Sequence, residues 1–271
     1  MQTAFICPIC KAPLAREGKS LLCPMRHTFD IAKSGYVNLL LKKAGQHGDN
    51  DAMLAARQGF LNSGYYSHLA NALKEALASL PLPASPAILD CGTGEGYYLE
   101  AARSALPDAS PRLYGFDISK QALLFAAKRR LDASLFVASA YAVPIADGTV
   151  DAALLFFSPF CREELLRTLK AGGYLLMAVP AEEHLWELKQ LIYDTPYRNA
   201  LSPFDIEGFT LLSHRHVERI IDLASQEEIQ LLFQMTPYYY KTSPRDKEKV
   251  RAADTLAVTA AFELLVYQKQ S

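Results

Sequence analysis

The stretch PAILDCGTGEGYYLEAAR, residues 86–103, constrains the fold of this chain more than any other part of the sequence. The apolar run around Ile88 and Leu89 predicts a buried strand, and residues 97–106 predict a helix. Between them, Gly92, Gly94 and Gly96 allow backbone conformations that other residues rarely adopt and let the backbone approach a ligand closely. The stretch therefore predicts a strand, a ligand-binding glycine turn and a helix.

Apolar runs alternate with helical patterns through the rest of the chain. Further strands are expected within residues 112–119, 134–140, 150–160, 170–180, 208–223 and 257–269. Alternating strands and helices are typical of an α/β fold, in which helices cover both faces of a mostly parallel sheet. We therefore expect a Rossmann-like sheet that is mostly parallel and whose last strand is antiparallel.

Acidic residues flank the glycine turn. The motif D-x-G-x-G-x-G differs from the dinucleotide fingerprint G-x-G-x-x-G, because Tyr97 occupies the place of the third glycine. A dinucleotide places its pyrophosphate on the helix N-terminus, where Asp90 and Glu95 would be unfavourable neighbours. S-adenosylmethionine (SAM) instead carries an ammonium group and a sulfonium, which carboxylates attract. We therefore expect the three glycines, Asp90 and Glu95 to bind SAM.

Two later strand ends add candidate cofactor contacts. Asp117 ends the strand that follows the glycine turn, where a carboxylate can accept hydrogen bonds from both ribose hydroxyls. NAD sites use the same contact, and Asp117 could also cap the helix that begins near Ser119. Ser139 ends the third strand, where it would face the adenine. Many methyltransferases have an acid there, and this chain has none.

The N-terminal segment gathers three of the five cysteines of the chain. Cys7-x-x-Cys10 and Cys23-x-x-x-His27 are two pairs separated by twelve residues. Tight turns within each pair would let three thiolates and one imidazole surround a tetrahedral Zn²⁺. The alternative is that these are ordinary buried thiols beside a chance histidine. The order and spacing of the ligands favour a structural zinc site, because four protein ligands leave no open position for catalysis.

Charge is unevenly distributed along the chain. The whole sequence has a net charge of −1, but residues 1–48 contain seven lysines or arginines against two acids, a balance of +5. Such a basic segment is either a solvated surface or an electrostatic contact for phosphate. No apolar run approaches the ~20 residues that span a bilayer, and no secretion signal opens the sequence. We therefore expect a cytoplasmic protein.

The N-terminal segment also resembles a known family. CPICKAPL followed by CPMRHTFDIAKSGYVNLLL is similar to the zinc module of the RlmA (RrmA) family, the 23S ribosomal RNA guanine-N1 methyltransferases. The resemblance continues through LDCGTGEGYY, ASAYAVP, LKAGG, HLWELKQLIY and LLFQMTPY. It implies a zinc-binding RNA-recognition module at residues 1–43, a linker and helical bridge at 44–83, and a SAM-dependent methyltransferase domain at 84–271.

The resemblance further implies a function and two site residues. The expected reaction is SAM-dependent methylation of guanine N1 in a hairpin loop of 23S ribosomal RNA, by an enzyme that could act as a homodimer. In this family a tyrosine before the bridging helix and a histidine after the fifth strand are associated with the cofactor. The matching residues here are Tyr66 and His184.

Several functional questions stay open at the level of sequence. Guanine N1 must lose a proton, but the sequence identifies no base, and Glu163 and Glu164 are only weak candidates. The aromatic and basic segment 231–249 could stack on unpaired nucleotides or simply pack. A small-molecule SAM methyltransferase with a purely structural zinc site remains an alternative, as does a non-catalytic RNA-binding protein.

Overall fold

The computed structural model describes residues 4–41 and 50–270, and a large sheet organises most of them. Its strands follow the order β10-β11-β9-β8-β5-β6-β7-β4. Their bounds are β4 Val37–Asn38, β5 Ala87–Cys91, β6 Arg112–Asp117, β7 Ala133–Val137, β8 Val150–Phe156, β9 Leu169–Pro180, β10 Phe209–Leu223 and β11 Leu256–Lys269. The expected Rossmann-like sheet is confirmed.

The direction of the strands also agrees with expectation. β5 pairs in parallel with β6 and β8, β6 with β7, and β8 with β9. The last strand, β11, lies antiparallel between β9 and β10. Parallel strands align their carboxyl ends, so the turns that follow β5, β6, β8 and β9 meet along one edge of the sheet.

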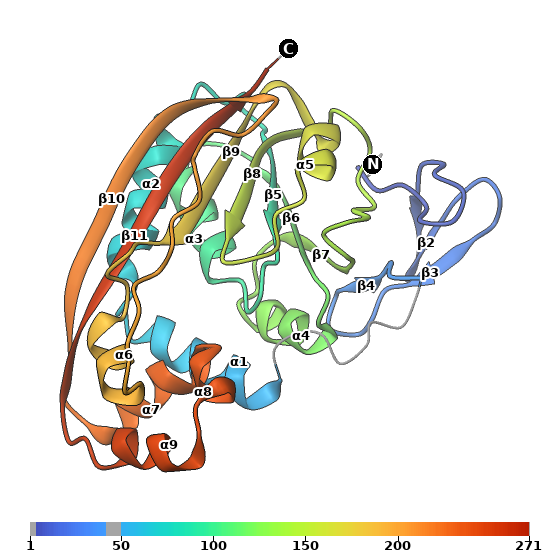
Figure 1. Cartoon of the computed structure of the whole chain (residues 1–271). Helices are drawn as coiled ribbons and strands as arrows, with labels where there is room; N and C mark the ends of the chain where they lie inside the picture. Colours follow the sequence, from blue (N-terminus) through green and yellow to red (C-terminus); the bar gives the residue numbers. More distant parts are fainter. Residues whose placement is uncertain (1–3, 42–49, 271) are drawn as a thin grey trace.

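Helices cover both faces and the carboxyl edge of this sheet. Their bounds are α1 Asp51–Asn62, α2 Ser67–Ala78, α3 Tyr97–Ala105, α4 Lys120–Lys128, α5 Arg162–Thr168, α6 Trp186–Ile192, α7 Gln226–Met235, α8 Tyr238–Lys241 and α9 Pro244–Arg251. In Figure 1, α1 and α6 to α9 gather below the sheet, where β5 ends and the glycine turn begins. These helices form a cap over the carboxyl edge.

The structure describes only part of the expected linker. Residues 42–49, including Lys42 and Lys43, lie outside the described residues. Within the expected linker and helical bridge, α1 begins at Asp51, and Asn50 caps this helix by accepting a hydrogen bond from the amide of Met53. The helical pattern that follows divides into α1 and α2, which are separated by a turn around Gly64.

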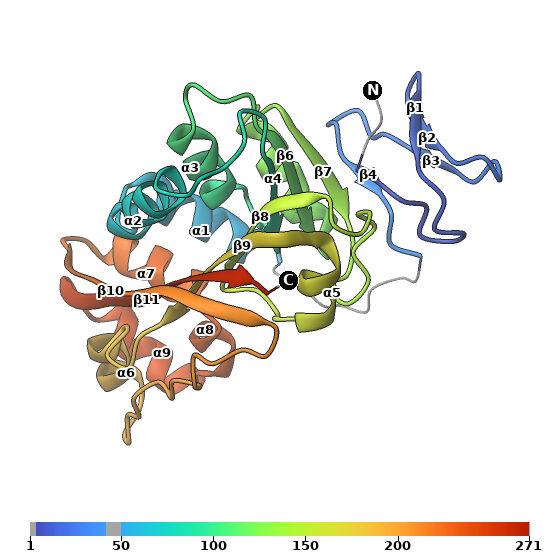
Figure 2. The same cartoon turned by 90° about the horizontal axis from the view of Figure 1, so that it is seen from above.

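The N-terminal segment is joined closely to the large sheet. Its strands β1 Ala15–Glu17, β2 Ser20–Leu22 and β3 Thr28–Asp30 form a separate antiparallel sheet. Figure 2 shows this small sheet beside the edge formed by β7 and β4. β4 pairs in parallel with β7 and extends the large sheet, an addition that the sequence did not predict.

Aromatic packing strengthens this connection. The ring of Phe5 makes edge-to-face contacts with Tyr114 and Phe136, at centroid distances of 5.8 and 5.0 Å. The backbone of Phe5 also pairs with that of Ile145 in an isolated antiparallel bridge. Because Phe5 is buried, the zinc-binding segment shares a hydrophobic core with one face of the large sheet.

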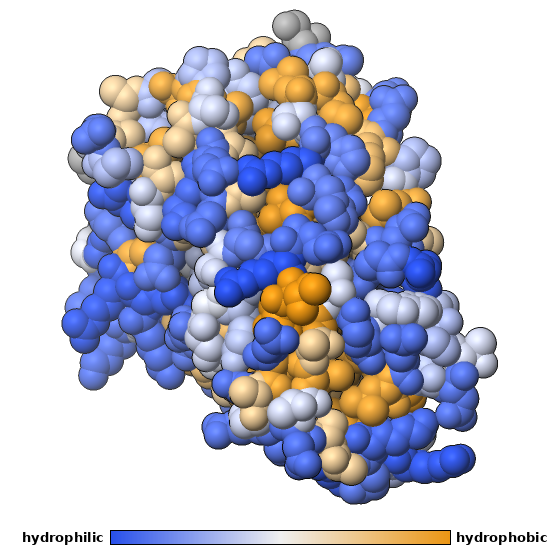
Figure 3. Space-filling model, turned by 90° about the vertical axis from the view of Figure 1, so that its left-hand side faces the viewer, coloured by the Kyte–Doolittle hydropathy of each residue, from blue (hydrophilic) through white to orange (hydrophobic). Residues whose placement is uncertain are grey.

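At the opposite edge, β10 is a long and exposed strand. Leu212 and Ile220 are exposed on it, and charged residues such as Arg215 and Arg219 lie between them. On this side of the molecule, Figure 3 shows apolar areas interrupted by hydrophilic side chains. Charges on an edge strand discourage pairing with other strands.

No helix within residues 4–41 and 50–270 combines the length and the apolar character that crossing a membrane requires.

Candidate functional site

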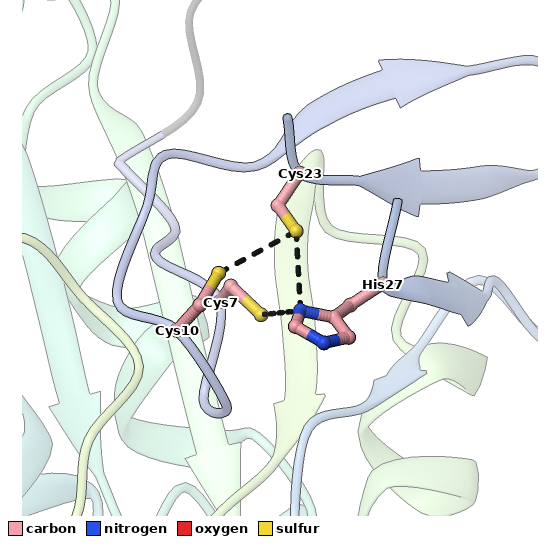
Figure 4. Close-up of side chains that lie close together, drawn as sticks. All are labelled: Cys7, Cys10, Cys23 and His27. Carbon is pink, nitrogen blue, oxygen red and sulfur yellow. Dashed lines mark hydrogen bonds between the residues drawn. The ribbon is translucent and has the colours of Figure 1, made fainter. Parts of the chain in front are cut away.

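The side chains predicted to bind zinc converge (Figure 4). Cys7, Cys10, Cys23 and His27 each offer one ligand atom, and these atoms all lie within 4.8 Å of one another. Nδ1 of His27 is 3.5 Å from Sγ of Cys7 and 3.4 Å from Sγ of Cys23. The sulfurs of Cys10 and Cys23 are 3.6 Å apart. Zinc bonds of about 2.3 Å to sulfur place tetrahedral ligands roughly 3.7 Å apart, so these residues fit a zinc ion.

Two tight turns create this arrangement. The amide of Lys11 donates to the carbonyl of Cys7, and the amide of Arg26 donates to the carbonyl of Cys23. Lys11 and Arg26 both adopt positive φ angles, 62° and 63°. The turns bring both ligand pairs to one centre, as the spacing in the sequence predicted. With four protein ligands, the centre serves to hold the N-terminal segment together.

The glycine turn lies between β5 and α3. Gly92, Gly94 and Gly96 have φ angles of 74°, 55° and 87°, a region in which a side chain would be strained. A Cβ atom at Gly92 would lie 2.4 Å from Cβ of Ser158, so this position has no room for a side chain. The amide of Thr93 donates to the carbonyl of Phe116, which ties the turn to the end of β6.

Asp117 holds this turn from the neighbouring strand. One carboxylate oxygen accepts a hydrogen bond from the amide of Gly94 at 3.0 Å, and the other accepts one from the amide of Ser119 at 2.8 Å. The cap of α4 is Ser119 itself, whose hydroxyl accepts from the amide of Ala122. Asp117 therefore organises the loops around the expected ribose position and does not cap the helix.

The two acids that flank the glycine turn have different environments. Glu95 is 1% exposed and forms an ion pair with Arg129, which also binds Glu100 and the side chain of Asn62. Burial raises the pKa of Glu95, and the charge of Arg129 opposes that shift. Arg129 was not among the residues to which the sequence pointed, because it lies 34 positions away on a different helix end.

Within residues 4–41 and 50–270, Asp90 is buried without an ion-pair partner of this kind. It is 2% exposed, and its carboxylate accepts a hydrogen bond from the hydroxyl of Thr93 at 2.6 Å. Burial raises its pKa to about 7, while the bond from Thr93 acts in the opposite direction. The charge of Asp90 therefore changes near neutral pH.

Tyr66 and His184 meet in the structure, although 118 positions separate them. The hydroxyl of Tyr66 lies 3.5 Å from Nε2 of His184, and both residues are buried. Burial lowers the pKa of His184 to about 3, so its imidazole is neutral at physiological pH. Phe262 packs against both rings at 4.9 and 4.5 Å. Tyr66 and His184 thus form a polar contact between the N-terminal end of α2 and the turn after β9.

Two further side chains approach the glycine turn. Arg57 of α1 places Nη1 3.9 Å from the position that a Cβ atom would take at Gly94, and its Nη2 donates to the carbonyl of Met235. The hydroxyl of Tyr98 is buried and has no hydrogen-bond partner among the described residues. No sequence motif marks Arg57, because only the cap of helices brings α1 over the turn. Tyr98 belongs to the motif LDCGTGEGYY, but the sequence alone indicated no role for it.

These residues fit SAM chemically. The open backbone of the glycine turn, the carboxylates of Asp90 and Asp117 and the guanidinium of Arg57 match a ligand that has hydroxyls, an ammonium and a carboxylate. Ser139 follows β7, where its hydroxyl accepts from the amide of Tyr141.

Other sequence candidates lie elsewhere or are already engaged. Glu164 accepts a hydrogen bond from the amide of Val143 and pairs with Arg167, which lowers its pKa despite partial burial. Glu163 is exposed. Both glutamates begin α5, and neither joins the residues around the glycine turn.

The two cysteines outside the zinc site and the three tyrosines of α8 have no role in the sites described so far. Cys91 is buried and Cys161 is partly exposed. Among the three consecutive tyrosines of α8, Tyr240 is exposed, and its hydroxyl accepts a hydrogen bond from Asn50. Tyr238 and Tyr239 pack partly into the cap. These tyrosines therefore act at least in part as packing residues.

Comparisons with known proteins agree with both parts of the structure. The family model of the RlmA N-terminal zinc ribbon matches residues 5–43, and the family model of a methyltransferase domain matches residues 88–173. Among solved structures, a candidate methyltransferase of Bacillus halodurans covers 74% of this chain and 99% of its own, with a TM-score of 0.50 and 14% identity. A chain from a Haloferax volcanii complex of a methyltransferase with its activator Trm112 covers 83% and 100%, with a TM-score of 0.52 and 22% identity.

Two relatives in sequence span nearly the whole chain, and a third spans two thirds of it. A Micromonospora griseorubida protein with the provisional name 23S rRNA (guanine-N(1)-)-methyltransferase is 33% identical over 97% of this chain and 96% of its own. YxjB of Bacillus subtilis carries the same provisional name and is 32% identical over 98% and 97%. The 23S rRNA (guanine(748)-N(1))-methyltransferase of Streptomyces fradiae is 38% identical over 67% and 65%.

Metal analysis tests the zinc centre. Purified protein is expected to contain about one zinc ion per chain, and the Cys10→Ser variant should lose it, because a hydroxyl is a poor substitute for a thiolate. Elemental analysis and thermal unfolding measure both effects, and Cys161→Ser serves as the control that retains zinc. A Cys10→Ser protein with its full zinc content would contradict the site.

The raised pKa of Asp90 predicts a pH dependence of SAM binding. As pH rises through about 7, Asp90 loses its proton and gains the negative charge that attracts a cationic ligand. The affinity for SAM should therefore rise roughly fivefold between pH 6 and 8, as measured by calorimetry. Asp90→Asn should remove this rise, and an unchanged pH profile in that variant would show that another group is responsible.

Proposed function

Because this chain belongs to the family of 23S rRNA (guanine-N1)-methyltransferases with an RlmA-type zinc ribbon, we propose that it methylates N1 of a guanine in a hairpin loop of 23S ribosomal RNA. The observation that carries this proposal is the likeness to such relatives over 97% of the chain, zinc ribbon included. A Rossmann-like methyltransferase with another substrate would share only the large sheet. The proposed cellular location is the cytoplasm, where ribosomal RNA is found.

The residues around the glycine turn hold and orient the methyl donor. When bound, SAM supplies a methyl group that its sulfonium makes electrophilic. Gly92, Gly94 and Gly96 leave three positions of the turn without side chains, and Asp117 faces the ribose position. Asp90 contributes negative charge, and Arg57 provides a cation for the carboxylate of the amino-acid part. Fixing the donor in this way lowers the entropic cost of bringing two reactants together.

The acceptor atom explains why RNA structure matters. Guanine N1 carries a proton on the Watson–Crick edge, which is hidden in any base pair. The guanine must therefore be unpaired, or be rotated out of its stack, before it reaches the carboxyl edge of the sheet. A hairpin loop offers such bases at low energetic cost. As the bond between N1 and the methyl carbon forms, the bond between that carbon and the donor's sulfur breaks, S-adenosylhomocysteine leaves, and the N1 proton passes to water.

The zinc-binding segment supplies positive charge for the RNA backbone. Lys11, Arg16, Lys19, Arg26 and Lys33 are all exposed on it. Because Phe5 and β4 fix this segment to the large sheet, phosphates bound to it would lie at a set distance from the methyl donor. A homodimer would present two such segments to one hairpin, and we include it in the proposal.

A primer-extension experiment tests the proposed reaction. The protein is incubated with SAM and unmodified 23S ribosomal RNA, and reverse transcription then maps the product. A methyl group on N1 blocks base pairing, so a new stop within a hairpin loop is expected. Methyl incorporation without any such stop would overturn the assignment of N1.

Charge reversal in the zinc-binding segment tests its role. The variant with Arg16→Glu and Lys19→Glu should show a roughly tenfold lower affinity for the RNA and a shallower dependence of affinity on salt. Its affinity for S-adenosylhomocysteine should stay unchanged, because both residues are exposed and belong to the small sheet or its turn. Unaltered RNA binding would place the RNA on another surface.

An analogue pair tests Arg57. The Arg57→Met variant should bind S-adenosylhomocysteine about tenfold more weakly in calorimetry, because a charge-assisted hydrogen bond to the carboxylate is lost. The decarboxylated analogue lacks that group, so its affinity should be the same for the wild-type and variant proteins. An equal loss for both ligands would mean that Arg57 only supports the fold of the cap.

A further inference from the structure

Phe157 has an unusual backbone conformation directly after β8. Its φ angle is 59°, in the left-handed region that favours glycine. Among the described residues other than glycine, this conformation recurs at Lys11, Arg26, Arg130 and Leu185. Lys11 and Arg26 belong to the two turns that position the zinc ligands. Strained backbone in this protein therefore occurs at a binding site, as it often does in proteins.

Contacts with the glycine turn hold Phe157 in place. The next residue, Ser158, packs against Gly92 so closely that a Cβ atom there would lie 2.4 Å from its own Cβ. The hydroxyl of Ser158 also donates to the carbonyl of Cys91, at the end of β5. The backbone after β8 is therefore packed tightly against the turn proposed to bind the methyl donor, which sets the direction in which the side chain of Phe157 leaves the backbone.

That direction leaves much of the Phe157 ring open to solvent. Phe157 is 48% exposed, whereas the preceding Phe156 is only 5% exposed. The ring lies 5.5 Å from Phe262 and 6.1 Å from Tyr98, both of which are buried. Phe262 in turn contacts Tyr66 and His184. The ring of Phe157 therefore packs against buried aromatic side chains next to the proposed cofactor residues, and part of it stays open to solvent.

The chemistry of an unpaired base fits this open ring. A nucleobase that leaves its stack loses its aromatic neighbours, and an aromatic side chain can replace them in a sequence-tolerant way. A phenyl ring has no hydrogen-bonding group, so stacking on it leaves the Watson–Crick edge of guanine, including N1, free to react. An ordinary exposed phenylalanine would not require a strained backbone.

We propose that Phe157 is the platform on which the acceptor guanine stacks while its N1 receives the methyl group. This inference rests on the proposed function and adds the base-binding residue to it. The strained turn after β8 then has a purpose, because the same contacts between Ser158 and Gly92 set the position of both the donor and the acceptor.

Binding measurements with two RNAs test the stacking directly. Once primer extension has located the modified guanine, a synthetic hairpin of that region is made with the guanine and with an abasic site at the same position. Both are bound to protein saturated with S-adenosylhomocysteine, so no reaction occurs. Wild-type protein should prefer the intact RNA about tenfold, and Phe157→Ala should reduce this preference to about twofold or less. An undiminished preference in Phe157→Ala would overturn the proposal.

Matched variants separate stacking from folding. Phe157→Tyr keeps an aromatic ring and should retain the preference, whereas Phe157→Leu keeps apolar bulk and should lose most of it. Phe160 is 40% exposed in the same loop and has no left-handed backbone, so Phe160→Ala should behave like the wild type. An equal loss in Phe160→Ala, or full retention in Phe157→Leu, would show that apolar surface alone is required.

Two controls make the failures distinguishable. All variants should bind S-adenosylhomocysteine within about twofold of wild type, because Phe157 is assigned to the acceptor; a large loss would make it a cofactor residue instead. If the wild-type protein gives no N1 stop in primer extension, the proposed function fails. If the stop appears and the Phe157 variants keep their base preference, only the stacking inference fails.

Discussion

The close packing of the glycine turn against its neighbouring strands is the constraint on which the rest of the site depends. Gly92 touches Ser158 after β8, and the amide of Gly94 donates to Asp117 after β6. These contacts connect three strand ends into one rigid edge. A side chain at position 92 would displace Ser158, and with it the backbone of Phe157. The proposed donor and acceptor positions are therefore built on one set of contacts.

The two acids that flank the glycine turn contribute differently to the charge at this edge. Glu95 forms a buried ion pair with Arg129, so its charge is largely neutralised by a structural partner. Asp90 has no such partner in the part of the chain that the structure describes, and burial raises its pKa to about 7. Arg57 brings a positive charge to the same turn from the cap. A ligand with both an ammonium and a carboxylate meets complementary groups at this turn.

The zinc-binding segment is a continuous part of the molecule in this structure. Phe5 shares a core with the large sheet, and Val37–Asn38 form β4 at the sheet edge. The metal ligands shape the segment itself, while Phe5 and β4 set its position. For an enzyme that acts on a folded RNA, this fixes the distance between a basic surface and the catalytic edge.

The sequence by itself determined the local units of this protein. The alternating strands and helices, the glycine turn and the spacing of Cys7, Cys10, Cys23 and His27 all act over short distances, so their patterns survive in the linear chain. Only the tertiary structure decided that Glu95 would pair with Arg129 and that Arg57 would reach the turn. It also decided the edge position of β4 and the outward direction of Phe157. The reason is physical: these features depend on which distant elements pack together, and no periodicity or spacing along the chain encodes a contact between two helices or a backbone strained by its neighbours.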